Sequence, residues 1–112
     1  MAKYMVLYNS SVSGSDTMAN ASPEQIKASM DEWIKWKDKA SESVKVEFGM
    51  PLQAINHVTQ DGVGVSQNEA SGYSILEGDS IEKILELLQK HPHLQRPGAS
   101  IDLLEFLSMP GL

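Results

Sequence analysis

The chain contains no cysteine in its 112 residues. This absence excludes disulfide bonds, thiolate catalysis, and zinc or iron–sulfur centres held by cysteine. A reducing compartment is the natural setting for such a chain, so we expect a cytoplasmic protein. Long apolar runs are absent too: the segment MAKYMVLYNSS is far too short for the core of a signal peptide or for a membrane span.

Positive charge is also scarce. Nine Lys and Arg stand against fifteen Asp and Glu, which gives a formal net charge of −6 and a pI near 4.9. Nucleic acids and anionic membranes bind concentrated basic patches, so we expect neither as a partner. The length, with 41% apolar and 21% charged residues, is typical of one globular domain spanning residues 1–112.

No strong catalytic motif occurs. The sequence lacks a Gly-rich phosphate loop, a Gly-x-Ser-x-Gly elbow and a basic aromatic platform. The histidines are His57, His91 and His93, and the last two could ligate a metal if a carboxylate completed the set. His91 follows a predicted helix end, however, where a partly positive side chain interacts well with the helix dipole. We therefore predict no metal and no cofactor.

Two segments carry apolar side chains on both faces of a predicted strand. In Lys3–Tyr8, Val6 and Leu7 point to opposite faces, and Ala99–Phe106 has the same character. Both faces of such strands must be covered, yet only two helices are predicted. Two helices cover one side of a four-stranded sheet, so we expect the other side to meet a second copy of the chain.

Both predicted helices begin with capping signals. Ser22 precedes Pro23 and lies three residues before Gln25, which is a capping-box arrangement, and Asp79 and Glu82 repeat that spacing. The second helix should end near Lys90. The apolar residues that recur at helical spacing should pack on the sheet; they are Ile26, Met30, Trp33, Ile84, Leu85 and Leu88.

The other segments complete an alternating order. Asn9–Ala21 is predicted to be a mobile surface loop, Val44, Val46 and Phe48 alternate as an edge strand, and Gly72–Glu77 is a further strand. Between them, Gln60, Asp61 and Gly62 predict a hairpin that joins Ala54–Thr59 to Gly62–Ser66. The fold class is thus α+β, a ferredoxin-like βαββαβ order with an antiparallel sheet and both helices on one face.

Several stretches together carry a family resemblance. They are KYMVLY, DEWIKWKDK, Gly49-Met50-Pro51-Leu52, GYSILEGDSIEKILELLQKHPHL and ASIDLLEFLSMP. Their order and spacing over nearly the whole chain resemble the YCII-related (DGPF/YCII-like) proteins of the dimeric α+β-barrel superfamily. The resemblance implies a homodimer of ferredoxin-like domains that pack sheet face to sheet face. Relatives in this superfamily include isomerases, monooxygenases and dehydrochlorinases that act on small organic molecules.

Two features of that family are missing. Some members carry a histidine in the first helix that is paired with an aspartate, but here the helix offers only Trp33 and Trp36. The Asp-Gly-Pro-Phe segment of a larger branch is replaced by Val65-Ser66-Gln67-Asn68-Glu69. The resemblance therefore transfers the fold but not the dyad.

A pocket, if present, should lie beside the first helix and the central strand. Its predicted border is Trp36, His57, Tyr73 and His93, aromatic or titratable residues near the ends or rims of their elements. Asp102 and Glu105, carboxylates among apolar residues on opposite faces of the last strand, are further candidates for a perturbed acid.

Two functions of different classes remain open. The first is the binding or transformation of a small organic molecule in that pocket, with the reaction unassigned. The alternative is a non-catalytic dimeric regulatory or interaction module whose sheet serves only assembly. The fold alone cannot choose between them, because it hosts many chemistries. Whether the protein is an enzyme is left undecided by the sequence. A pocket with convergent polar groups would favour the first reading, and a filled interior the second.

Overall fold

A computed structural model describes residues 2–11 and 21–111. Most of the predicted loop Asn9–Ala21 lies outside the described residues. The elements in chain order are β1 (Ala2–Asn9), α2 (Pro23–Ala40), β2 (Lys45–Pro51), β3 (Asn56–Thr59), β4 (Gly62–Val65), β5 (Ala70–Gly78), α3 (Ile81–Gln89), the 3₁₀ helix η1 (Pro92–Gln95) and β6 (Ser100–Glu105). Neither α-helix combines the length and the apolar character that crossing a bilayer requires.

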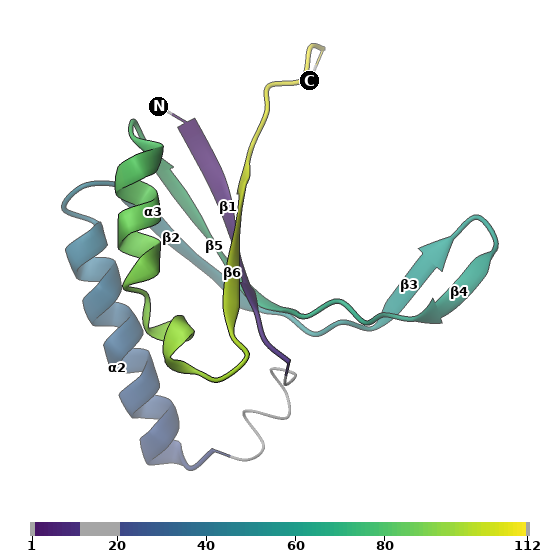
Figure 1. Ribbon diagram of the computed structural model, residues 1–112, viewed down its shortest axis with the longest axis horizontal. Helices are drawn as coiled ribbons and strands as arrows, with labels where there is room; N and C mark the ends of the chain where they lie inside the picture. The colour runs from purple at the N-terminus through teal and green to yellow at the C-terminus, as the bar shows by residue number, and fades with distance from the viewer. Residues whose placement is uncertain (1, 12–20, 112) are drawn as a thin grey trace.

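Four strands form one antiparallel sheet in the order β2-β5-β1-β6. Both α-helices lie on one side of it (Figure 1). The predicted α+β class with two helices and an antiparallel sheet is confirmed, as is the edge position of β2. The central strand β5 runs from Ala70 to Gly78 and is therefore longer at both ends than the predicted Gly72–Glu77.

The two helices begin in different ways. At α2 the predicted capping box is present: Gln25 N–H donates to Ser22 Oγ at 3.2 Å, and Ser22 N–H donates to Gln25 Oε1 at 2.9 Å. At α3 the predicted cap at Asp79 is wrong by one residue. Ser80 takes that position, and its Oγ accepts from Lys83 N–H at 3.2 Å. Adjacent Asp and Ser are both good caps, so spacing alone could not separate them.

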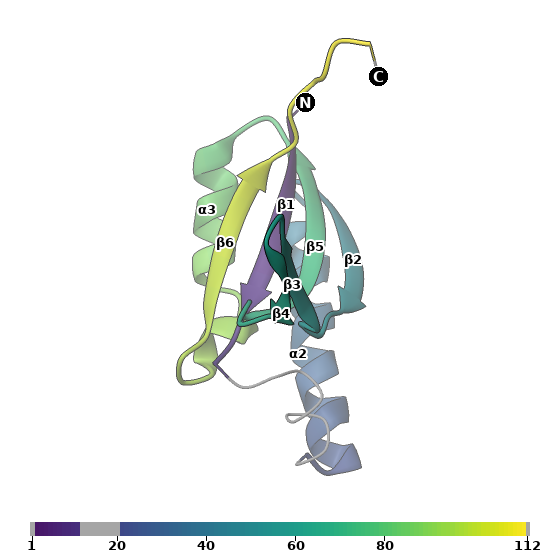
Figure 2. The same cartoon turned by 90° about the vertical axis from the view of Figure 1, so that its right-hand side faces the viewer.

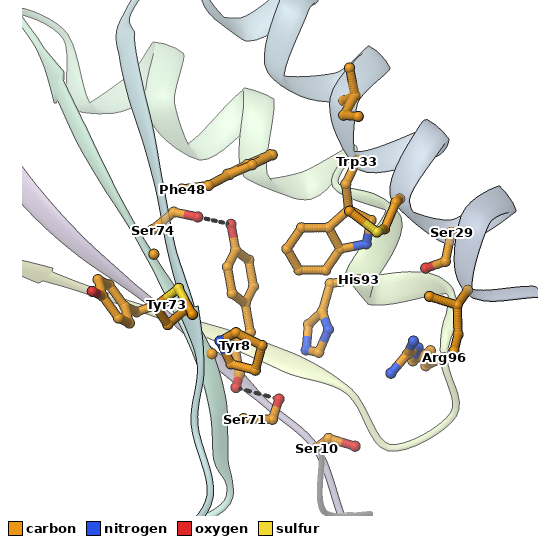
Figure 3. A pocket seen from close by; sticks show the side chains of 17 residues that line it. Tyr8, Ser10, Ser29, Trp33, Phe48, Ser71, Tyr73, Ser74, His93 and Arg96 are labelled. Atoms are coloured by element: carbon orange, nitrogen blue, oxygen red, sulfur yellow. Dashed lines mark hydrogen bonds between the residues drawn. The ribbon is translucent and has the colours of Figure 1, made fainter. Parts of the chain in front are cut away.

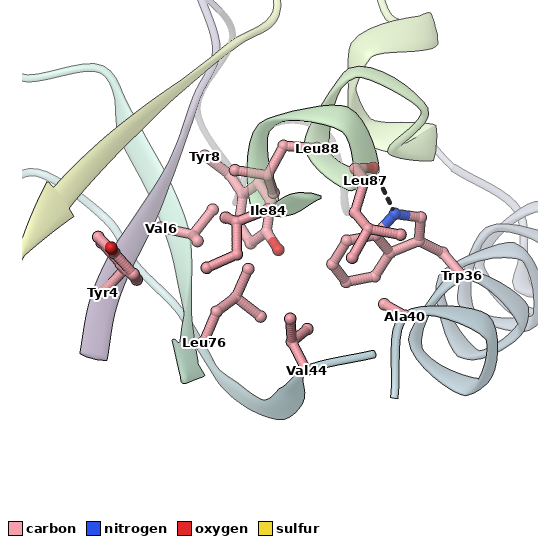
Figure 4. Packing of buried hydrophobic residues seen from close by; sticks show 10 residues of the cluster. All are labelled: Tyr4, Val6, Tyr8, Trp36, Ala40, Val44, Leu76, Ile84, Leu87 and Leu88. Carbon is pink, nitrogen blue, oxygen red and sulfur yellow. Dashed lines mark hydrogen bonds between the residues drawn. The ribbon is translucent and has the colours of Figure 1, made fainter. Parts of the chain in front are cut away.

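The core lies between the helices and the sheet (Figure 4). It consists of Tyr4, Val6, Tyr8, Trp36, Ala40, Val44, Leu76, Ile84, Leu87 and Leu88. The predicted burial of Ile84 and Leu88 is confirmed, whereas the predicted packing of Met30 and Leu85 is wrong. Leu85 is exposed because α3 turns Ile84, Leu87 and Leu88 to the sheet instead. Met30 is 59% exposed because the first half of α2 borders a cavity rather than filled interior.

The opposite face of the sheet carries an apolar strip. Met5 stands between Ile75 on β5 and Leu104 on β6 in the strand register, and Leu7 neighbours Tyr73. No helix of the described chain covers this face, which Figure 2 shows in front of the helices. Asp102 is also on it and accepts a hydrogen bond from Asn9 Nδ2 at 2.8 Å. Glu105, on the other face, is exposed as well.

The predicted hairpin exists but stands apart. Strands β3 and β4 pair only with each other, as a two-stranded sheet of their own. They project from the end of β2 and β5, on the side away from the helices (Figures 1 and 2). Asp61 leads into Gly62, whose φ of +149° suits glycine.

Candidate functional site

A cavity of about 500 Å³ lies between the first half of α2 and the sheet (Figure 3). Its walls come from α2, from the adjoining ends of β1, β2 and β5, and from η1 and the residue after it. This volume is within the range of sites for small organic ligands. The cavity exists because α3 covers only part of the sheet. At this end the short η1 and the loop after it lie beside the cavity in place of a longer α3.

Aromatic rings form the inner wall. The ring centroids of Tyr8 and Trp33 are 4.8 Å apart with an edge-on tilt of 62°, and those of Trp33 and Phe48 are 6.0 Å apart. The His93 ring lies 5.2 Å from Tyr8 and 6.1 Å from Trp33. These edge-to-face contacts hold the rings in fixed relative orientations. The result is an apolar surface suited to a flat ligand.

Tyr8 carries a buried hydroxyl in the wall of the cavity. Its Oη lies 2.8 Å from Ser74 Oγ, and both side chains are buried. Burial raises the pKa of Tyr8 to about 12, although the hydrogen bond to Ser74 acts in the opposite direction. At neutral pH the phenol is therefore protonated. Ser71 Oγ donates to the Tyr8 carbonyl at 3.0 Å and fixes the adjacent backbone.

The His91-Pro92-His93 segment supports the wall from behind. His91 Nδ1 accepts a hydrogen bond from His93 N–H at 3.0 Å, and the His91 ring packs 4.5 Å from Trp33 and 4.3 Å from Trp36. Burial, with a smaller contribution from neighbouring His93, lowers the pKa of His91 to about 3. The expected positive His91 at the helix end is therefore wrong, because the ring is buried among aromatic groups and stays neutral.

His93 is neutral for the same reason. Burial lowers its pKa, and the backbone of Asn9 partly offsets that effect. Its Nε2 lies 2.9 Å from the Asn9 carbonyl, so Nε2 carries the proton and donates it. Among the described residues no group of three His, Cys, Asp or Glu side chains gathers that could hold a metal.

The four residues predicted for the pocket divide into two pairs. His93 and Tyr73 line the cavity. The Tyr73 ring points away from the other aromatic rings (Figure 3) and lies over Gly49, because residue 73 alternates with inward-facing Ser74. Tyr73 is therefore a border residue.

The other two are not in the cavity. Trp36 is 8% exposed in the core, and its Nε1 donates to the Leu87 carbonyl at 2.9 Å. Trp33 packs against the core as predicted but also lines the cavity, whereas Trp36, predicted for the border of the pocket, fills the interior. His57 is exposed on the isolated β3–β4 hairpin and does not line this cavity.

Arg96 is the charged residue of the lining, and the sequence reasoning missed it. It is the only arginine of the chain and follows directly after η1. No carboxylate of the described residues pairs with it. In Figure 3 its guanidinium lies on the side of the cavity away from Tyr73. A single arginine in an acidic chain, three residues after a histidine pair, was the available signal.

Comparison of the chain with protein-family models and with curated proteins found no match. The site is therefore interpreted from its own geometry.

Proposed function

We propose that the cavity binds a small, flat organic molecule. The observation that carries this proposal is the 500 Å³ space whose wall is built from Tyr8, Trp33, Phe48 and His93. Apolar ligands gain free energy by leaving water for such a surface, and planar rings stack on fixed aromatic side chains. The polar groups at its edge, among them Ser10 and Ser71, can orient the ligand.

The ligand carries an acidic group. No carboxylate of the described residues pairs with the Arg96 guanidinium, which lies at the edge of a mostly apolar space in a chain of net charge −6. Arginine binds carboxylates with two parallel hydrogen bonds, a geometry that lysine does not offer. A small aromatic carboxylate satisfies both the rings and the cation. The long-range field of the protein opposes anions, so this local contact has to supply the selectivity.

The described groups of the cavity favour binding over transformation. Tyr8 is protonated at neutral pH because its pKa is raised to about 12, so its phenol is a poor base. A lowered pKa keeps His93 neutral, and its Nε2 proton is committed to a backbone carbonyl. The reaction, if any, stays unassigned. A regulatory module that senses an aromatic acid fits these groups.

The fold supports a place among ferredoxin-like, YCII-related proteins of the dimeric α+β-barrel superfamily. Ignoring the hairpin, the four strands follow the sheet order second-third-first-fourth with a helix after the first and third, which is the split βαβ plan. We extend the proposal to a cytoplasmic homodimer. The uncovered strip of Met5, Leu7, Ile75 and Leu104 is its interface.

Ligand binding is tested by fluorescence. In a Trp36→Phe variant, Trp33 is the only tryptophan of the chain. Addition of 2-naphthoate should quench its fluorescence in a saturable way. The neutral analogue 2-naphthalenemethanol should bind more weakly. Arg96→Gln should weaken 2-naphthoate about tenfold and leave the alcohol unchanged. Arg96→Lys is the matched control for charge without the planar fork. No saturable quenching by either compound would contradict the binding proposal. An equal loss of affinity for both compounds in Arg96→Gln would contradict the role of Arg96 in binding the carboxylate, without contradicting the binding proposal itself.

Assembly is tested separately by sedimentation velocity. The wild-type chain should sediment as a dimer at micromolar concentration, and Leu104→Asp should convert it to a monomer of 12.3 kDa. Leu107→Asp is a suitable control because Leu107 is exposed beyond the end of β6. A wild-type monomer would contradict the dimer without bearing on the ligand.

A further inference from the structure

The β3–β4 hairpin has little support from the rest of the described chain. Every residue from Ile55 to Val65 is exposed, and its two strands hydrogen-bond only to each other within the described residues. A lone two-stranded hairpin is at best marginally stable in water, since it needs a third strand or a packed face. Four of its residue pairs are nevertheless in register. An ordered hairpin of this kind needs a surface to pack on.

The hairpin has one apolar face. Residues opposite each other in an antiparallel pair point to the same side, so Val58 with Val63, and Val65 with Asn56, share a face. The other face carries His57 opposite Gly64 and Thr59 opposite Gly62. The three valines are 70 to 80% exposed. A strand pattern with valine on one side and glycine or polar residues on the other is that of a half-buried sheet.

The position of the hairpin identifies what covers the valines. It projects on the side of the sheet that no helix of the described chain covers (Figure 2), the same side that carries Met5, Leu7, Ile75 and Leu104. From Leu52, whose N–H donates to the Ser71 carbonyl, to the turn at Gln60 the chain spans about 25 Å at strand rise. Stacked sheets are only about 10 Å apart. A second copy on the uncovered strip must therefore lie beside the hairpin.

We infer that the hairpin is an intermolecular arm that packs its valine face on the second copy of a homodimer. Two-fold symmetry gives each copy one arm and one receiving surface, so a single association covers both valine faces. The arm suits a meeting of two acidic chains because its strands carry no charged side chain and its turn carries only Asp61. This inference rests on the sheet-face dimer proposed above and is independent of the ligand.

Amide hydrogen exchange tests the arm directly in the wild-type chain. Amides of residues 56–65 should exchange at least about tenfold more slowly above the dimer dissociation constant than below it. Exchange as fast in the dimer as in an unstructured peptide would overturn the arm while leaving the sheet-face dimer standing. Protection that persists in the monomer would also overturn it, because the valines would then pack within one chain. A chain that is monomeric at every concentration would overturn both.

Two variants with equal added charge separate the faces of the hairpin. Val63→Asp should raise the dimer dissociation constant by about tenfold or more, and His57→Asp, on the opposite face of the same pair of strands, should change it less than about twofold. Equal effects of the two would overturn the inference. Because the chain has no cysteine, Val63→Cys and His57→Cys can each carry one environment-sensitive fluorophore. Only the label at residue 63 should shift to the blue on dimerisation, and a label there that stays solvent-exposed in the dimer would overturn the arm even if Val63→Asp fails to fold.

Discussion

The two ends of the helix–sheet layer are filled to different degrees. At one end α2 and α3 lie side by side over the sheet, and Trp36, Val44, Leu76, Ile84 and Leu87 close the interior (Figure 4). At the other end the sheet continues but α3, half the length of α2, does not. There a cavity remains, bordered by Tyr8 and Phe48 on the sheet and by Trp33 on α2.

The difference shows that a tryptophan's role depends on what lies opposite it. Trp33 and Trp36 are three residues apart on one helix and on nearly the same face. Trp36 meets Leu87 of α3, and Trp33 meets the Tyr8 and Phe48 rings at the border of the cavity. One end of the layer therefore supplies stability, and the other supplies a binding surface.

The largest expected effect comes from breaking the filled end. Trp36→Ala should lower the free energy of unfolding by about 3–5 kcal/mol, because it leaves a cavity and removes the donor to the Leu87 carbonyl. Trp33→Ala, at the hollow end, should cost about 1–2 kcal/mol because its ring already borders empty space. Urea unfolding measures both. Equal losses would contradict the contrast between the two ends.

Acid should destabilise the protein through His91, which packs against both Trp33 at the hollow end and Trp36 at the filled end. The pKa of His91 is lowered from 6.5 to about 3. Between these two pH values the unfolded chain binds a proton at His91 that the folded chain does not bind. The contribution of neutral His91 to the free energy of unfolding is complete above pH 6.5 and is lost as the pH falls toward 3. From this residue alone it should fall by about 2 kcal/mol between pH 6.5 and pH 5.

Two variants isolate that contribution. His91→Asn keeps a side-chain acceptor for the His93 N–H but cannot titrate, so it should flatten most of the pH slope. The remaining slope belongs to His93, whose pKa is also lowered. His57→Gln removes a histidine from the separate β3–β4 hairpin and is the control variant. Equal slopes for wild type and His91→Asn would show that His91 takes up its proton in the folded state.

A smaller effect is expected from the buried hydroxyl at the hollow end. Tyr8→Phe removes the partner of Ser74 Oγ and should cost about 1 kcal/mol in urea unfolding. Tyr73→Phe makes the same chemical change on the other side of the sheet, where the hydroxyl has no partner among the described residues, and should be near neutral. A larger loss for Tyr73→Phe would reverse the assignment of inner and outer tyrosine.

The smallest effect on stability should come from filling the cavity. Ser29 lines it from α2, and Ser29→Phe adds a ring to the open space at a cost of about 1 kcal/mol or less. The same change should abolish saturable binding of 2-naphthoate. Ser41→Phe, just past the other end of α2 and away from the cavity, is the matched control. Retained binding in Ser29→Phe would place the ligand elsewhere.

The elements were predictable because their signals are local. The Ser22–Gln25 box, the alternation in β2 and the Asp61–Gly62 turn each depend on neighbours within a few residues. The two-sided apolar character of β1 likewise depends only on the alternation of a strand. Such signals fix the α+β class and the uncovered sheet face.

The cavity was predictable only in part. His93 stands out because few histidines occur, but the roles of Trp33 and Trp36 depend on where α3 ends over the sheet, which no local pattern encodes. The same holds for Met30, whose helical spacing marks it as core although it borders the cavity and is 59% exposed. His57 was misplaced because the hairpin leaves the sheet, a property of the segment between Pro51 and Asn56 rather than of the hairpin itself.

The unequal anchorage of α2 has a consequence for how the cavity is reached. Its buried side chains, Trp36 and Ala40, are both in its second half, and its first turn carries the two Ser22–Gln25 hydrogen bonds. Fraying of that first half therefore requires far less free energy than global unfolding. The wall can part and reclose around a ligand while the core stays intact, and the fraction of time it spends closed sets how much of the intrinsic affinity is observed.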